Sequence, residues 1–180
     1  MKGKIKMYKF ENIKNHFIKI CIHKKWVLYY CIKAGIPIQG ILHDISKFSP
    51  TEFWEGVKYY QGTSSPIDAC KKEKGWSAAW LHHKGRNKHH YEYWQDNFDN
   101  GGTPIKMPLK YKKEMLCDYL GAGKAYYGNN FTYEKELAWW KIKNSKPLAM
   151  HPDDREFITY WLHQIVKNEH TAFNQLRRMI

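Results

Sequence analysis

The sequence predicts an all-α protein, and three observations favour this class. Apolar residues recur close to a period of 3.6 in the long segments, as Phe17, Ile20 and Val27 do in the first of them. No stretch sustains the alternation of apolar and polar residues that is typical of a half-buried strand. Proline and glycine stand between the periodic segments, where helices begin and end. The chain has 180 residues and no convincing internal boundary, so we expect residues 1–180 to form one compact helical domain.

The first helices follow from these signals in order. Residues 6–34 carry the first periodic stretch, which Gly35 ends. Pro37 suits the first turn of a second helix, over about 37–48. Ser49 then stands as a candidate N-cap, followed by proline in the first turn, which predicts a third helix as far as about residue 60.

The remaining segments alternate between helices and polar loops. Two segments bounded by glycine and proline, 62–75 and 98–108, are expected to be loops. The last helix carries Asp153 and Asp154 in its first turn, where carboxylates favour the helix dipole. Helices are expected over about 76–84, 89–94, 108–127, 132–143 and 153–179.

Composition excludes several classes of protein. The aromatic content of 16% argues against long disorder, and no stretch reaches the roughly 18 apolar residues of a membrane span. The N-terminal segment is basic but lacks the apolar core of a secretory signal. We therefore expect a cytoplasmic protein without membrane association. Four cysteines without a C-x-x-C pair exclude a zinc ribbon and are expected to be reduced thiols: Cys21, Cys31, Cys70 and Cys117.

The charge of the chain favours anionic partners. The formal net charge is +13, from 30 lysines and arginines against 17 aspartates and glutamates. A field of this sign attracts nucleotides, nucleic acid or phosphorylated metabolites. A solvated basic surface without a ligand explains the same numbers equally well.

The segment AWLHHKGRNKHHYEYW, residues 79–94, concentrates histidine in two doublets. If one helix ran through it, His83 and His90 would share a face, and so would His82 and His89. We therefore expect one histidine of each doublet to face a common site. We favour His83 and His90, with His89 as the alternative in the second doublet.

Three further positions carry the same kinds of side chain. His23 lies in the first helix, His43 and Asp44 lie in the second, and Asp118 lies in the apolar stretch EMLCDYLGAG. Each alone has an ordinary explanation, because histidines and aspartates are common on helix surfaces. Together they supply the imidazoles and carboxylates that Zn, Fe and Mn prefer. One divalent metal site would explain both the histidine cluster and a carboxylate in an apolar setting.

The order of these residues resembles the HD-domain superfamily of metal-dependent phosphohydrolases, whose pattern is H…HD…H…H…D. HDISK, residues 43–47, resembles the HD-x-G-K motif of that superfamily, with Ser46 in place of glycine. HDISKFSPTEF, AWLHHKGRNKHHYEYW and MLCDY together resemble a small uncharacterised HD-like family of bacteria and phages, over most of residues 15–165. The resemblance implies a helical bundle of HD-domain type with one or two divalent ions, Mn, Fe, Zn, Co or Mg. The ligands it implies are His23, His43, Asp44, His83, His90 or His89, and Asp118.

The same resemblance implies a hydrolase. Asp44 would bridge two metals, and Lys47 would face the substrate phosphate, so both are candidate catalytic residues. We expect a phosphohydrolase that acts on a nucleotide or a related small phosphate through a metal-activated water. Candidate substrate-binding residues beside the ligands are Lys47, His82, Lys84, Arg86, Asn87 and Lys88.

Two alternatives belong to other functional classes. Some HD-type proteins use the same six ligands in a di-iron oxygenase, and bound iron with oxygen uptake would identify that activity. The chain could also be a non-catalytic module that contains a metal and binds nucleic acid or nucleotides. Aromatic and basic residues interleave in HHYEYW and KAYYGNNF, where exposed rings could stack on bases. Salt-sensitive nucleic-acid binding that survives replacement of Asp44 would favour the module.

Overall fold

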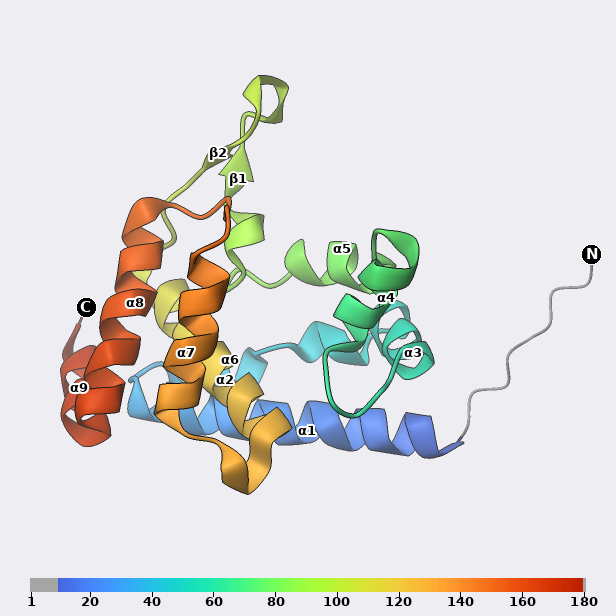
Figure 1. The fold of residues 1–180 in the computed structure, drawn as a ribbon, viewed down its shortest axis with the longest axis horizontal. Helices are drawn as coiled ribbons and strands as arrows, with labels where there is room; N and C mark the ends of the chain where they lie inside the picture. Colours follow the sequence, from blue (N-terminus) through green and yellow to red (C-terminus); the bar gives the residue numbers. More distant parts are fainter. Residues whose placement is uncertain (1–9, 180) are drawn as a thin grey trace, which may run out of the picture.

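The structure is a computed structural model that describes residues 10–179, and within that range helices make almost all of the fold (Figure 1). The α-helices are α1 (Phe10–Lys33), α2 (Pro37–Leu42), α3 (Pro50–Lys58), α4 (Pro66–Lys74), α5 (Ala78–Lys84), α6 (Leu109–Tyr127), α7 (Tyr133–Asn144), α8 (Pro152–Lys167) and α9 (Glu169–Arg178). The short elements are the 3-10 turns η1 (Ile45–Phe48), η2 (Tyr91–Tyr93), η3 (Phe98–Asn100) and η4 (Gly128–Asn130), and the strands β1 (Gln95–Asp96) and β2 (Thr103–Pro104). The predicted all-α class is confirmed.

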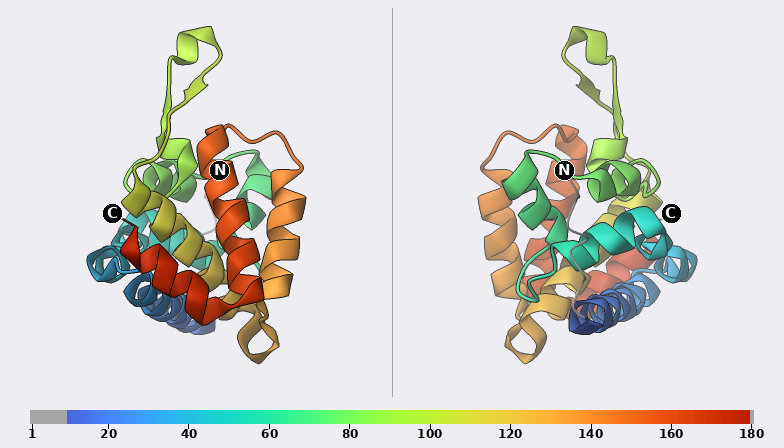
Figure 2. Two further views of the ribbon diagram at one scale, coloured as in Figure 1. Left: turned by 90° about the vertical axis from the view of Figure 1, so that its left-hand side faces the viewer. Right: turned by 90° about the vertical axis from the view of Figure 1, so that its right-hand side faces the viewer.

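The helices form two groups that α1 joins. On one side α6 packs against α1 and α8, and α8 contacts α7 and α9. On the other side α3 contacts α4, α5 and α1 (Figure 1). The two strands pair as a small antiparallel hairpin that projects from the body of the molecule (Figure 2). No helix among residues 10–179 is both long enough and apolar enough to span a bilayer.

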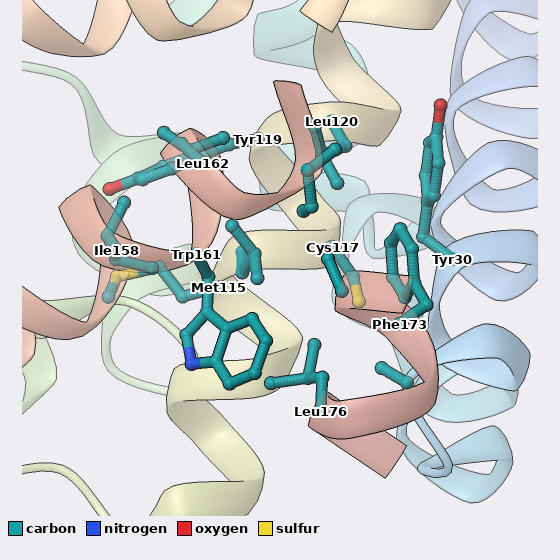
Figure 3. Close-up of a cluster of buried hydrophobic side chains, with 14 of the residues drawn as sticks. Tyr30, Met115, Cys117, Tyr119, Leu120, Ile158, Trp161, Leu162, Phe173 and Leu176 are labelled. Atoms are coloured by element: carbon teal, nitrogen blue, oxygen red, sulfur yellow. The ribbon is translucent and has the colours of Figure 1, made fainter. Parts of the chain in front are cut away.

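Helix α6 lies at the centre of the larger group. Every residue from Lys112 to Gly121 is buried, which explains why this helix shows no single apolar stripe. Figure 3 shows α6 side chains such as Met115 and Leu120 meeting the side chains of α8 and α9. Trp161 and Phe173 complete this core, and both are buried. A carboxylate on α6 is therefore held by a rigid element with packing around it.

Helices α1 and α6 approach each other closely at a glycine. A Cβ atom on Gly121 would lie 2.5 Å from Cγ2 of Val27 and 3.0 Å from its backbone nitrogen. The absence of a side chain at Gly121 allows the two helices to pack at this distance. His23 lies one turn before Val27, and Asp118 lies one turn before Gly121, so the same contact brings these two side chains together.

Two predicted helices are broken in the structure. The helix expected over 37–48 ends at Leu42, and Asp44 adopts the left-handed conformation with φ of 54° before η1 begins. The helix expected over 153–179 is divided at Asn168, which caps α9 by accepting a hydrogen bond from the Thr171 amide. Periodicity continues across both breaks, so the apolar pattern gave no sign of them.

Other differences concern short elements. The expected loop 62–75 contains α4, which starts at a proline in its first turn and ends at Gly75 in the left-handed conformation. The expected helix 89–94 is only the 3-10 turn η2, and the expected loop 98–108 contains η3 and β2. The other helices lie close to their expected ranges. Residues 6–9 of the expected first helix fall outside the described residues.

Candidate metal centre

The first group of candidate ligands comes from three parts of the chain. His23 projects from α1, His43 and Asp44 lie at the junction of α2 and η1, and Asp118 projects from α6. His23 Nε2 lies 3.1 Å from Asp118 Oδ1 and 3.3 Å from Asp44 Oδ2. His43 Nε2 lies 3.2 Å from the same Asp44 oxygen. All four side chains are buried, and their ligand atoms lie within 4.8 Å of one another, which is a suitable spacing for one metal ion.

A second group shares one residue with the first. Asp44 Oδ1 lies 3.3 Å from His83 Nε2 and 3.5 Å from His89 Nε2. His83 Nε2 lies 2.9 Å from His90 Nε2. These four residues also offer ligand atoms within 4.8 Å of one another. Asp44 therefore directs one carboxylate oxygen to each group, as a ligand between two ions would.

The polar atoms at the shared residue are not satisfied by the protein. Both Asp44 oxygens and His89 Nε2 are buried and have no hydrogen-bond partner among the described residues. Lys47 Nζ lies 2.6 Å from Asp44 Oδ2 as an ion pair, but its geometry is not that of a hydrogen bond. An unsatisfied buried polar group costs about 1–3 kcal/mol. Divalent cations bound at the two groups would satisfy all three atoms, so the residues present fit a metal.

Two glutamates orient the histidines from behind. Glu114 Oε1 lies 3.0 Å from His43 Nδ1 and 3.1 Å from His89 Nδ1. A carboxylate bound to the far ring nitrogen fixes the tautomer of a ligating histidine and makes it a better ligand. Because one carboxylate serves a histidine of each group, Glu114 couples their orientations. Glu114, His43 and His89 also form a third group with metal-ligand spacing.

Glu52 has the corresponding role at the first histidine doublet. Its Oε2 lies 2.7 Å from His83 Nδ1, and its Oε1 lies 2.6 Å from His82 Nδ1. Sequence reasoning missed both glutamates. The available signal was local: Glu114 precedes Asp118 by one helical turn, and Glu52 lies in the first turn of α3, just after the HDISKF motif.

Electrostatics in the cluster favour ionised carboxylates. Burial alone would raise the pKa of Asp44, but the charges of His43, Lys47 and His83 outweigh it and hold that pKa well below its usual range. The pKa of Asp118 is also well below its usual range, because hydrogen bonding to His23 and His43 outweighs burial. Both carboxyl groups are therefore ionised near neutral pH and can act as anionic ligands.

The pKa values of His43 and His90 are shifted in opposite directions. Burial lowers the pKa of His43, but attraction by Asp44 and its other carboxylate partners outweighs burial, so the pKa is raised well above its usual value. Burial, and then the positive charges of His89 and His83, hold the pKa of His90 well below its usual value. A metal at the first group would compete with a proton on His43, whereas His90 is neutral and free to act as a ligand.

A cavity of about 220 Å³ opens beside the ligands. His23, His83, His90 and Asp118 contribute to its wall, so ligands of both groups face the same space. Lys47 lines it too, together with Lys19 from α1. The cavity is large enough for a phosphate group and places two ammonium groups at its wall.

The predicted substrate-binding residues of the histidine segment lie elsewhere. Lys47 lines the cavity, but none of the other five does. Arg86 and Lys88 are exposed, and Asn87 donates hydrogen bonds to Ser46 Oγ and the His83 carbonyl. Lys84 and His82 are half-buried, and His82 is paired with Glu52. Asn87 and His82 therefore support the loop of candidate ligands, and Lys84, Arg86 and Lys88 do not line this cavity.

The two histidine doublets behave differently. Helix α5 ends at Lys84, as the sequence predicts, so the register of one continuous helix does not apply to this segment. In the first doublet His83 faces the cluster and His82 does not. In the second doublet the turn after α5 brings both His89 and His90 to Asp44. Both histidines of the second doublet therefore offer candidate ligand atoms, where the sequence led us to expect one.

Comparison with known proteins places the chain in one family. A family of unknown function, DUF5662, matches residues 12–164. Neither a curated protein nor a solved structure matches the chain. The matched range contains every candidate ligand from His23 to Asp118 and covers most of the sequence. The chain therefore belongs to DUF5662, a family of unknown function.

Proposed function

We propose that this protein is a metal-dependent phosphohydrolase that acts on a nucleotide or a related small phosphate. The observation that carries the proposal is the position of Asp44. Its two carboxylate oxygens face two separate groups of buried ligands, and both groups border one cavity with lysines at its wall. The order of the ligands along the chain, which resembles the HD-domain superfamily, supports the same activity.

In this proposal, two groups of candidate ligands would each hold one ion. His23, His43, Asp44 and Asp118 would hold one, and Asp44, His83, His89 and His90 would hold the other. Bound divalent ions at such a site supply Lewis acidity and make water a better nucleophile near neutral pH. Two aspartates would leave a pair of divalent ions with a net positive charge, which suits a phosphate substrate.

The chain's own residues would bind and orient the phosphate. Lys47 lines the cavity beside Asp44, and burial disfavours its charged form. Attraction by Asp44 and Asp118 outweighs burial, so the pKa of Lys47 is raised and its ammonium keeps its charge. Lys19, whose Nζ donates to the Ala125 carbonyl 2.9 Å away, adds a second fixed ammonium. In the hydrolysis a water oxygen bonds to phosphorus, the bond from phosphorus to the ester oxygen breaks, and the leaving oxygen takes a proton.

The test is phosphate release by the full chain loaded with Mn, Fe, Zn, Co or Mg. The substrates are ribose 5-phosphate and a panel of mono-, tri- and cyclic nucleotides. We expect release from at least one substrate and its loss in Asp44→Asn. Asp99→Asn, the same change at an exposed position on the hairpin, should leave release unchanged. No release from any substrate at full metal occupancy would overturn the proposal.

A histidine-rich donor set also suits iron, which keeps a di-iron oxygenase as the second candidate. It requires the same ligands and differs in the metal and in the reaction. Iron retained through purification, with oxygen uptake and no phosphate release, would select the oxygenase. The binding-module alternative has less support, because Tyr91 and Trp94 of HHYEYW pack against the core.

A further inference from the structure

A second cavity, of about 410 Å³, adjoins the metal centre. It shares part of its wall with the cavity beside the ligands, including Trp80, His90 and Tyr126. Trp80 packs edge-on against His90, with ring centroids 4.9 Å apart. If the phosphate of a bound molecule lay at the metal centre, the rest of that molecule could extend past His90 into the second cavity.

The wall of this cavity is rich in aromatic rings. They come from α5, η2, α6 and α7, and planar groups stack favourably on such rings. The aromatic residues that line it are Trp80, Tyr91, Tyr119, Tyr126, Tyr127 and Trp139. Lys143 already places its ammonium 5.1 Å from the Tyr119 ring centroid and 5.2 Å from that of Trp139. The remaining space therefore suits a neutral planar ligand better than a second cation.

The balance of acidic and basic residues at this cavity is opposite to that of the whole chain. Asp68, Glu92 and Glu136 line the cavity, against Lys143 as the cation among its lining residues. In a chain with a net charge of +13, this is a local excess of acidic groups. Such a wall disfavours phosphate and favours a group that donates hydrogen bonds.

The carboxyl groups of this wall are not fully satisfied. Glu92 Oε2 is buried and has no hydrogen-bond partner in the described part of the chain. Glu136 is 4% exposed and lines the cavity, and burial outweighs the attraction of Lys143 for its ionised form. Unsatisfied buried groups are rare in proteins, and at a cavity wall they indicate a missing polar ligand.

The backbone makes room for Glu136. A Cβ atom on Gly123 would lie 2.2 Å from Glu136 Oε2, so the carboxyl group occupies the space beside a glycine of α6. Burial, with a contribution from the negative charge of Asp118, raises the pKa of Glu136 to about 8. A carboxyl group that is protonated at neutral pH both donates and accepts a hydrogen bond. That pattern complements the edge of a base with an amino group beside a ring nitrogen.

We propose that the second cavity binds the base of an amino-bearing nucleotide, with Glu136 as the group that recognises the base edge. The proposal rests on the proposed function for the placement of the phosphate at the metal centre. It adds a substrate class: nucleotides of adenine, guanine or cytosine are favoured over those whose bases lack the amino group.

The test measures binding of nucleosides, which carry no phosphate, to the metal-loaded full chain by isothermal titration calorimetry. Three pairs isolate the amino group: adenosine with purine riboside, guanosine with inosine, and cytidine with uridine. In at least one pair we expect the amino-bearing member to bind about tenfold more tightly, as for one hydrogen bond to a buried group. Equal affinities in all three pairs, or no binding of any nucleoside, would overturn the proposal.

Variants of one helix identify the recognising group. Glu136→Leu should abolish the preference, whereas Glu136→Gln should keep most of it, because an amide offers the same donor and acceptor as a protonated carboxyl group. Glu134→Leu, the matched change at an exposed position of α7, should bind like the wild type. A preference unchanged in Glu136→Leu would contradict the assignment.

Failure of the two proposals can be distinguished. Ribose 5-phosphate has no base, so its hydrolysis reports on the metal centre alone, and nucleoside binding requires no hydrolysis. Hydrolysis of ribose 5-phosphate without a nucleoside preference would overturn only the base-binding cavity. A nucleoside preference without any phosphate release would overturn only the phosphohydrolase.

Discussion

At the residue scale, the conformation of Asp44 explains why the HD motif interrupts a helix. Its φ of 54° lies in the left-handed region, which aspartate tolerates better than most residues other than glycine. A regular helix would direct the side chains of His43 and Asp44 in directions about 100° apart. The break instead allows both to meet His23 and Asp118. The local strain, on the order of 1 kcal/mol, would be offset by the binding of metal ions at this site.

Glu114 gives a prediction about metal affinity. Glu114→Gln keeps the size of the side chain but replaces the carboxylate that binds His43 and His89 with a neutral amide. We expect metal affinity to fall by about 10- to 100-fold, as for other carboxylates behind ligating histidines. Metal titration with a competing chelator measures this. Glu156→Gln, an exposed change on α8, serves as the control, and equal affinities for the two variants would contradict the role of Glu114.

Glu136 gives a prediction about pH. Its pKa is raised from 4.5 to about 8 in the folded protein, so between these values the folded state binds more protons than the unfolded state. The stability that this group contributes is present below pH 4.5 and is lost as pH rises through about 8. Denaturant unfolding across this range should therefore show a smaller fall in stability for Glu136→Gln than for the wild type. Parallel pH profiles would show that Glu136 is ionised in the folded protein.

At the element scale, the site depends on how α1 and α6 pack. His23 and Asp118 lie on facing sides of these helices, and the small residue Gly121 sets their separation near Val27. The remaining candidate ligands come from the last turn of α5 and from the segments that follow α2 and α5, which are short helices supported by α1 and α3. Positions on the long helices should therefore affect both stability and metal binding.

Gly121→Ala tests this contact. Its methyl group would overlap Val27, so we expect a loss of about 1–3 kcal/mol in the free energy of unfolding. We also expect weaker metal binding, because separation of the helices moves His23 away from Asp118. Urea denaturation and metal titration measure the two effects. The double variant with Val27→Ala should be less destabilised than the sum of the single changes, and simple additivity would contradict a direct clash.

At the scale of the whole molecule, the ligands connect the two groups of helices. Helix α5 lies in one group of helices and α6 lies in the other. The set of candidate ligands that includes His83 of α5 and the set that includes Asp118 of α6 both contain Asp44. Ions bound at these sites would link parts of the chain that otherwise meet mainly through α1. Metal binding should therefore stabilise the fold as a whole, because the unfolded chain does not assemble the site.

Metal removal tests this link. At a free metal concentration of about 1,000 times Kd, bound metal contributes about 4 kcal/mol, which corresponds to a Tm increase on the order of 10 °C. Adding a chelator to the wild type should remove this increase, and Asp44→Asn should show a much smaller change. Calorimetric unfolding with and without chelator measures the difference. An unchanged wild-type Tm would argue against ions that hold the two groups together.

Particular residues show how far sequence reasoning reached. The expected class and most helix ranges are confirmed, since an apolar period of 3.6 is a local property of the chain. Asp118 is a candidate from sequence because a carboxylate in an apolar helix requires compensation, and His23 and Asp44 are candidates because of their residue types and their order along the chain. Glu52 and Glu114 were missed because an acidic residue on a helix has many uses, and their histidine partners lie 25 or more residues away.

The sequence by itself determined that the chain is helical and that its histidines and aspartates occur in an order suited to metal binding. Those properties depend on residue type and short-range spacing. Only the tertiary structure decided that Asp44 faces both ligand groups, that His89 and His90 point the same way, and that an acidic aromatic cavity adjoins them. Contacts of this kind depend on the distance between packed helices and on the conformation of the loops where helices end. Long-range packing determines both, and no local pattern in the sequence predicts it.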